Sequence, residues 1–147
     1  EVGGSVGLDG VKVGPRVQLT DTDDEGVIAT VGISAKGLPF PTGEASPGVL
    51  VGAEESLYVG VPTSEVSQLV LVGRTAQDVG LANGNRATLL WAGGGLGFSW
   101  FADEHFRLAP EVGAMVPVLV VDESGDASGF RGGVVQVGIG FAYGQRR

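Results

Sequence analysis

The chain carries one histidine, His105, and its neighbours are residues through which hydrolytic chemistry could run. Asp103 and Glu104 precede it and Ser99 lies just upstream, so an arrangement of serine, histidine and carboxylate is conceivable. Such catalysis needs the base within hydrogen-bonding reach of its nucleophile. The pattern places His105 in a short polar turn, Ala102 to His105, where a solvated histidine is the simpler interpretation. The sequence therefore predicts no catalytic residues and a protein that is not an enzyme.

The densest group of carboxylates is the run from Asp21 to Glu25. Carboxylate oxygens are good ligands for Ca²⁺, but the run lacks the full pattern of a calcium-binding loop. A solvated turn is the simpler interpretation, and cation binding by this run stays open. The glycines Gly93 to Gly95 lack the strand, loop and helix context of a phosphate-binding loop. Because the chain also has no cysteine, the sequence predicts neither a metal site nor a cofactor.

A third group consists of charged and amide side chains that recur on one face of alternating segments. Arg107 and Glu111 share such a face, and Arg74 or Glu54 are candidates to join them. Charges inside a narrow barrel must be paired, so a polar plug that makes the barrel rigid is favoured over an ion pathway. The predicted polar cluster of the lumen comprises Lys12, Arg16, Gln18, Arg107, Glu111 and Gln136.

These side chains lie on segments where apolar and polar residues alternate with a period of two, which indicates β-strands with two different faces. Between Val11 and Thr20 the segregation is nearly perfect, and the preceding dipeptide Asp9-Gly10 is typical of a tight hairpin. Several segments reach the roughly nine to eleven residues that cross a bilayer when tilted. About eight segments are predicted, at 2–8, 11–20, 27–36, about 48–61, about 66–75, one ending at 101, 106–120 and 134–143.

The connections between these segments are predicted to alternate in length after the first hairpin. Short turns are expected at Pro62 to Glu65 and Ala102 to His105, and long loops at Gly37 to Pro47, Ala76 to Arg86 and Asp122 to Gly129. Outer-membrane barrels have short turns at one end and longer loops at the other. An even number of strands would place both termini at the end with the short turns.

Composition narrows the class of protein. A length of 147 residues is typical of a single domain, 1–147, and a net charge of −8 argues against nucleic acid as a partner. Mean hydropathy is positive at +0.25, yet no apolar stretch approaches the roughly 20 residues of a transmembrane helix. The start of the chain does not resemble an export signal. A signal is therefore expected to have been removed or to lie upstream, and whether Glu1 is the natural start stays open.

Alternation alone does not say which face meets water, because a soluble sandwich or barrel would turn its apolar face inward. Two features favour lipid on the apolar face. The polar face is rich in Gly, Ala and Ser, which suits the lumen of a narrow barrel. Aromatic residues also gather at segment ends, as in the girdle that meets a membrane interface. The predicted girdle comprises Phe98, Trp100, Phe101, Phe106, Phe141 and Tyr143.

The closing segment Gly132 to Tyr143, preceded by Phe98-Ser99-Trp100-Phe101 and by Phe106 to Gly113, resembles the C-terminal strands of small bacterial outer-membrane β-barrel proteins. The family's usual C-terminal aromatic residue is replaced here by Gly144-Gln145-Arg146-Arg147. The resemblance implies an all-β fold, an antiparallel up-and-down β-barrel of about eight strands, spanning the outer membrane of a Gram-negative cell envelope.

The function expected from this resemblance is a structural, adhesive or surface-interaction role, with the long loops as the binding surface. The partners expected are the lipid bilayer and a protein or a second copy bound through the loops. A wide diffusion pore is not expected, because eight strands leave an interior only just wide enough for side chains. The alternative is a soluble secreted β-barrel or sandwich that binds an apolar ligand.

Overall fold

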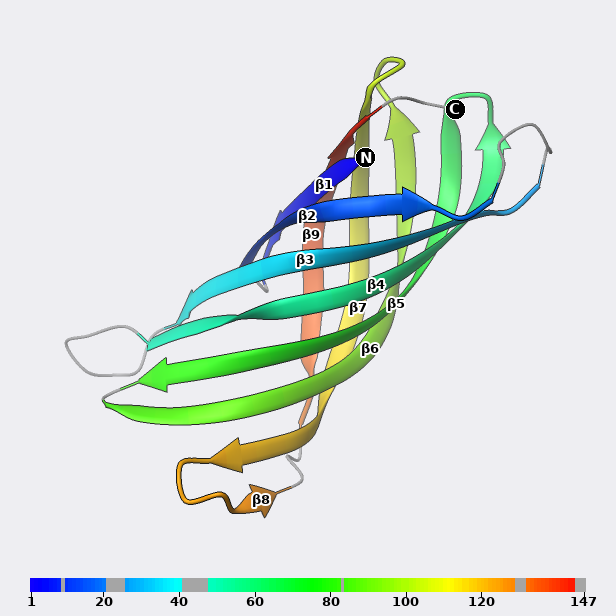
Figure 1. Ribbon diagram of the computed structural model, residues 1–147. Helices are drawn as coiled ribbons and strands as arrows, with labels where there is room; N and C mark the ends of the chain where they lie inside the picture. Colours follow the sequence, from blue (N-terminus) through cyan, green and yellow to red (C-terminus); the bar gives the residue numbers. More distant parts are fainter. Residues whose placement is uncertain (9, 21–25, 41–47, 83, 129–131, 145–147) are drawn as a thin grey trace.

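The computed structural model describes residues 1–8, 10–20, 26–40, 48–82, 84–128 and 132–144, and its regular structure there is entirely β-strand (Figure 1). The strands are β1 (Val2–Gly7), β2 (Gly10–Gln18), β3 (Ile28–Phe40), β4 (Gly48–Ser64), β5 (Ser67–Ala82), β6 (Asn85–Phe101), β7 (Phe106–Asp122), β8 (Ala127–Ser128) and β9 (Val134–Tyr143). The predicted antiparallel all-β fold is confirmed. Within the described ranges, no helix is long and apolar enough to cross a membrane.

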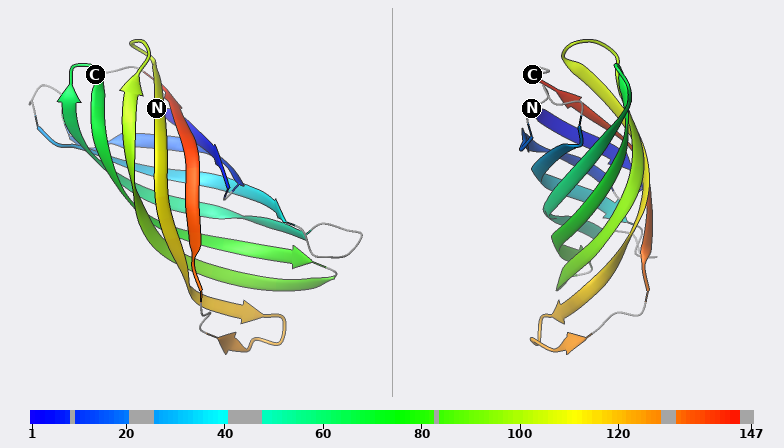
Figure 2. Two further views of the ribbon diagram at one scale, coloured as in Figure 1. Left: turned by 180° about the vertical axis from the view of Figure 1, so that it is seen from behind. Right: turned by 90° about the vertical axis from the view of Figure 1, so that its right-hand side faces the viewer.

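The strands close into a ring. Strands β1 to β7 pair antiparallel in chain order, β9 pairs with β7, and β9 pairs on its other side with β1. Val2, for example, pairs with both Pro15 of β2 and Tyr143 of β9. The two-residue strand β8 pairs only with the end of β7. The strands are steeply tilted as they pass around the ring (Figure 2), so the molecule is barrel-like, with a face toward the axis and a face away from it.

Polar side chains occupy the inner face of this ring, and apolar side chains occupy the outer face. Among the described residues, eleven polar or charged residues are buried but only four apolar ones, Val72, Ala76, Met115 and Ala142. Large apolar side chains on the outer face stay exposed, as with Ile33 at 60%. This is the reverse of a water-soluble domain, whose interior is normally apolar.

The alternating sequence accounts for this division, because successive side chains of a strand point to opposite faces. In β2, Lys12 and Arg16 are buried whereas Val13 and Val17 are more than half exposed. The predicted hairpin before β2 forms, but one residue earlier than the dipeptide Asp9-Gly10, since Gly7 pairs with Gly10 and Gly10 begins β2. Gly10 has a φ of 105°, a left-handed conformation that favours glycine.

Glycine allows close approach of the backbones where β6 and β7 meet on the inner face. Gly95 pairs with Gly113, and a Cβ atom added to Gly95 would lie 2.5 Å from the carbonyl oxygen of Val112. Real side chains do not approach backbone this closely, so the spacing of β6 and β7 at this point depends on glycine.

Two ends of the ring can be distinguished. At the terminal end, β1 begins and β9 ends, and the connections 19–27, 65–66 and 102–105 lie there. At the far end lie the connections 8–9, 41–47, 83–84 and 123–133 with β8. The start of β1 and the end of β9 are neighbours, because Val2 pairs with Tyr143, in agreement with the expected even number of long strands.

The predicted long loop from Ala76 to Arg86 is wrong. Strand β5 continues to Ala82 and β6 begins at Asn85, so only residues 83–84 connect them. Polar Gln77 and Asp78 suggested a loop, but Asp78 points inward and is fully buried against Lys36. The predicted alternation of short and long connections is therefore also wrong at the far end.

The predicted loop from Gly37 to Pro47 is likewise too long, because β3 continues to Phe40, where Phe40 pairs with Gly48. Residues 41–47 lie outside the described residues. The loop from Asp122 to Gly129 forms in part. Asp122 closes β7, its carboxylate accepts hydrogen bonds from the backbone N–H groups of Ser124 and Asp126, and β8 follows directly.

Candidate functional site

The centre of the ring holds a network of charged side chains built around Glu54 of β4, which is 1% exposed. The Lys12 ammonium of β2 donates a hydrogen bond to Glu54 Oε2 at 2.6 Å. Arg74 Nε of β5 lies 3.1 Å from Glu54 Oε1 and forms an ion pair with it. The Ser56 hydroxyl donates a weak bond to the same oxygen at 3.4 Å. Two cations therefore share one buried carboxylate.

Arg74 extends the network past the neighbouring strand β6 to β7 and β9. Its guanidinium donates to both carboxylate oxygens of Glu111 on β7 and to Gln136 Oε1 on β9 at 3.0 Å. Both bonds to Glu111 come from the same nitrogen, Nη2, and charge-assisted hydrogen bonds of this kind are about twice as strong as neutral ones. Lys12, Glu54, Arg74, Glu111 and Gln136 are called the central network below. It joins β2, β4, β5, β7 and β9.

A second buried pair lies on the far-end side of the sheet. Lys36 of β3 donates to Asp78 Oδ2 of β5 at 2.6 Å, across the intervening strand β4. Gly52 is the residue of β4 that pairs with both, and a Cβ atom there would collide with Asp78 Oδ1. Glycine on the middle strand therefore leaves room for the ion pair above it.

The terminal end has its own polar side chains. Arg16 donates to the Tyr58 hydroxyl at 3.1 Å, and its guanidinium carbon lies 4.6 Å from the centre of that ring. Arg107 donates to Glu1 Oε2 at 2.9 Å and lies 5.7 Å from the ring centre of Phe101. Cations over aromatic faces are attracted by the ring quadrupole, so both arginines have an aromatic partner.

The structure brings together only part of the polar cluster that the sequence predicts. Lys12, Glu111 and Gln136 join the central network, whereas Arg16 and Arg107 lie toward the terminal end. Gln18 lies apart from both, because its amide donates to the backbone oxygen of Thr20 at 2.8 Å.

Sequence reasoning missed three inner-face residues and left two others as alternatives. Tyr58 and Lys36 were not selected, and Asp78 was placed in a loop. Glu54 and Arg74 were offered as alternatives, yet both belong to the network. Their partners lie between 20 and 62 positions away in sequence, so only the strand register reveals the pairs. The sequence did offer one indication of inner-face residues, which is a charged residue on the face of a strand that otherwise carries small residues.

Five of the six predicted girdle residues lie on the outer face near the terminal end. They are neighbours on adjacent strands, because Trp100 pairs with Leu108, Leu108 with Phe141, and Phe106 with Tyr143. Phe101 differs. It pairs with Arg107, so both side chains point to the inner face, and the placement of Phe101 in an outer girdle is wrong. The five outer residues are Phe98, Trp100, Phe106, Phe141 and Tyr143.

The structure does not assemble the hydrolytic arrangement that was considered from the sequence. Ser99 is 1% exposed on the inner face, whereas His105 lies in the exposed turn and stacks on Tyr143 with ring centres 6.0 Å apart. The Asp103 carboxylate accepts the backbone N–H groups of His105 and Phe106, at 2.7 Å each. These two bonds lower the pKa of Asp103, and they make the aspartate a turn-stabilising residue.

No group of three or more potential metal ligands gathers within the described ranges. The acidic run from Asp21 to Glu25, which sequence reasoning left open as a cation site, lies outside them.

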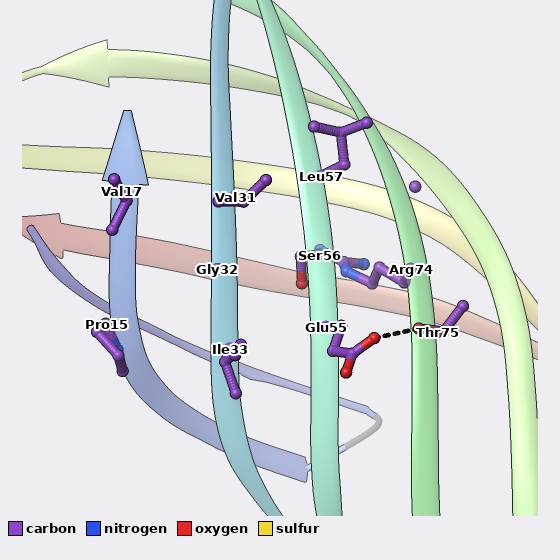
Figure 3. A pocket seen from close by; sticks show the side chains of 11 residues that line it. Pro15, Val17, Val31, Gly32, Ile33, Glu55, Ser56, Leu57, Arg74 and Thr75 are labelled. Atoms are coloured by element: carbon purple, nitrogen blue, oxygen red, sulfur yellow. Dashed lines mark hydrogen bonds between the residues drawn. The ribbon is translucent and has the colours of Figure 1, made fainter. Parts of the chain in front are cut away.

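The outer face carries a hollow of about 640 Å³ over β2 to β5 (Figure 3). Val17, Val31 and Leu57 are among the apolar residues around it. One carboxylate among the residues that line the hollow, that of Glu55 near the middle of β4, is exposed. The Thr75 hydroxyl donates a hydrogen bond to it at 3.3 Å. Glu55 is therefore a charged interruption of an otherwise apolar surface.

The arrangement as a whole is a ring of strands with an ion-paired interior, an apolar outer wall and an aromatic cluster at one end. In comparison with known proteins, no family model matches the chain, and no curated protein or solved structure gives a significant match.

Proposed function

We propose that this chain is a β-barrel protein of the bacterial outer membrane, with a structural or surface-interaction role and no enzymatic activity. The observation that carries the proposal is the reversed distribution of side chains. Large apolar side chains are exposed all around the ring, while the buried residues are mainly polar or charged. Contiguous apolar surface on this scale is a feature of proteins that meet lipid or another protein, and a closed ring of strands leaves no unpaired backbone in lipid.

The lipid-facing band also accounts for the position of the aromatic cluster. Phe98, Trp100 and Phe141 are 45%, 49% and 37% exposed on the outer face near the terminal end. Amphipathic rings favour the boundary between hydrocarbon and headgroups. Short connections occur at both ends, 65–66 and 102–105 at the terminal end and 8–9 and 83–84 at the far end, so the aromatic cluster and not the loop lengths distinguishes the terminal end.

The central network favours a closed barrel over a diffusion pore. Its ion pairs join four strands inside the ring, and the hydrogen bond from Arg74 to Gln136 adds β9. A ring of eight long strands has little space left beyond its own side chains. The purified protein is therefore expected to give no stepwise conductance in planar bilayers. Stable conductance steps that persist after removal of contaminating porins would contradict this part of the proposal.

A surface role would be carried by the far end. The hairpin that begins at Asp122 and ends with β8 is exposed, and the connection 41–47 is at the same end. Residues 76–82, proposed from the sequence as part of a binding loop, belong to the wall of the ring. Replacement of residues 123–128 by a tight turn is expected to preserve the fold and to reduce self-association of vesicles that carry the protein.

The experiment that tests the membrane assignment is fractionation of the producing cells, followed by electrophoresis of the membrane fraction with and without boiling. A protein that partitions with the outer membrane and changes mobility on boiling would support the proposal. A protein that is monomeric and folded in buffer without detergent would overturn it.

A soluble protein that holds an apolar ligand was the alternative from the sequence. That function needs an apolar inner face, but the described inner face carries Lys12, Glu54, Arg74 and Asp78. No observation on the described residues favours it over the membrane proposal.

A further inference from the structure

A small cavity lies inside the ring between the central network and the terminal end. It measures about 30 Å³, which is room for a few water molecules or one small ion rather than for an organic ligand of drug size. Residues of seven strands, β2 to β7 and β9, contribute to its wall. The polar side chains that line it are Arg16, Thr30, Tyr58, Gln68, Ser99, Arg107 and Glu111. It is called the end cavity below.

The charges around the end cavity do not balance. Both carboxylate oxygens of Glu111 already accept hydrogen bonds from Arg74. Arg107 forms an ion pair with the Glu1 carboxylate. Arg16 is 8% exposed, and among the described residues it has the Tyr58 hydroxyl as its hydrogen-bond partner and no carboxylate. A buried guanidinium without a counter-charge is costly. The end cavity therefore holds one positive charge in excess.

A second, independent observation comes from Ser99. Its side chain is 1% exposed, it lines the same cavity, and its hydroxyl oxygen has no hydrogen-bond partner among the described residues. Buried hydroxyl groups are nearly always bonded, so an unpartnered one on a cavity wall indicates a guest that accepts or donates a hydrogen bond. A hydroxyl donor beside two guanidinium groups fits an acceptor with negative charge.

The structure assigns the end cavity as a binding site for a small oxyanion of the size of inorganic phosphate, held by Arg16, Arg107 and Ser99. Guanidinium groups bind oxyanions through paired N–H donors, and Ser99 supplies a further donor. The central network forms the floor of the site, so the anion enters from the terminal end and does not pass through the ring. The site depends on the closed ring and its inner face, and not on whether the outer face meets lipid.

The test is isothermal titration calorimetry with inorganic phosphate on protein folded in a non-ionic detergent without phosphate groups. Saturable binding of one phosphate per chain is expected. Arg16→Gln and Arg107→Gln are expected to weaken it by about tenfold or more, because each removes charge-assisted bonds. Ser99→Ala removes one uncharged donor and is expected to weaken it by about three- to tenfold. The matched control is Arg86→Gln, an exposed arginine at the far end, which should bind phosphate like the parent protein.

Each variant is first checked for the mobility change on boiling, and Ser99→Ala keeps the test decisive if an arginine variant does not fold. A titration of the parent protein without saturable heat, or binding that Ser99→Ala leaves unchanged, would overturn the assignment. Glycerol 3-phosphate, the soluble headgroup of a lipid, serves as a second probe. Binding no tighter than that of phosphate supports a free anion, whereas tighter binding would contradict a free anion in favour of a lipid phosphate.

Discussion

Glu54 shows how a single residue can organise the interior of the ring of strands. Its carboxylate is surrounded by Lys12, Arg74 and Ser56, and the next residue, Glu55, points to the opposite face and is exposed. Removal of one partner from a buried ion pair leaves an uncompensated charge, which costs far more than the loss of an exposed carboxylate. These adjacent glutamates therefore make a matched pair for experiment.

Glu54→Gln is expected to lower the free energy of unfolding by about 3–5 kcal/mol, because two buried cations lose their shared counter-charge. Glu55→Gln, one position away on the outer face, is expected to cause no such loss. Urea unfolding in detergent micelles or vesicles, followed by tryptophan fluorescence, measures the difference. Equal stability of the two variants would show that the central network does not hold the ring together.

A second prediction about a single residue concerns a glycine on the inner face. Gly95→Ala would place a methyl group against the Val112 carbonyl oxygen, and crowding of this kind typically costs about 1–3 kcal/mol. Gly73 lies on the outer face with nothing within 4 Å of an added Cβ atom, so Gly73→Ala should be tolerated. The comparison is made by the same unfolding assay, and a Gly95→Ala protein as stable as Gly73→Ala would disprove the close approach of β6 and β7.

At the scale of the element, the turn between β6 and β7 depends on the ionised Asp103. Its pKa is lowered by the hydrogen bonds from the backbone N–H groups of His105 and Phe106. A carboxyl group with a lowered pKa in the folded state stabilises that state above its ordinary pKa, and the contribution disappears as pH falls through the lowered value. Protection of the His105 and Phe106 amide protons, measured as their exchange rate relative to an unstructured peptide at the same pH, should therefore decrease in acid. Asp103→Asn should show a smaller dependence on pH, and identical pH profiles for the two proteins would refute the role.

Individual strands differ in how well the sequence predicts them. In β2 the period-two pattern predicts the strand and the side chains that share each face, because Lys12 and Arg16 alternate there with valines. In β5 it fails after Thr75, since Asp78 looks like a loop residue until its partner Lys36 is known. An ion pair that crosses an intervening strand depends on the register of three strands together. The sequence around each partner therefore does not identify the other partner.

The aromatic residues of β6 also show where prediction from the sequence succeeds and where it fails. Phe98 and Trp100 alternate with Ser99, so their common outer face follows from the sequence. Phe101 falls on the other face by the same alternation, yet its aromatic character suggested a girdle position. The structure gives it a different role as the partner of the Arg107 guanidinium.

For the whole molecule, the main question is whether the outer face contacts lipid or water. Substitution of Glu55 on that face tests this. A lysine near the midplane of a lipid-facing barrel wall costs about 2–4 kcal/mol, whereas a leucine there is favourable. We expect Glu55→Leu in phospholipid vesicles to be more stable than Glu55→Lys by about this amount. On a water-exposed surface the two would differ by about 0.5 kcal/mol or less, and that result would count against a bilayer around β4.

The most direct test is a scan of spin labels along the neighbouring strands β3 and β4 of the protein in vesicles, which is simple here because the chain has no cysteine. Labels are placed singly at outer positions such as Val31, Ile33 and Leu57 and at inner positions such as Thr30 and Ser56. The account predicts a period of two, with outer labels accessible to oxygen dissolved in the lipid and shielded from a water-soluble nickel reagent. Outer labels that are fully accessible to the nickel reagent would contradict the claim that the apolar face of the ring meets lipid.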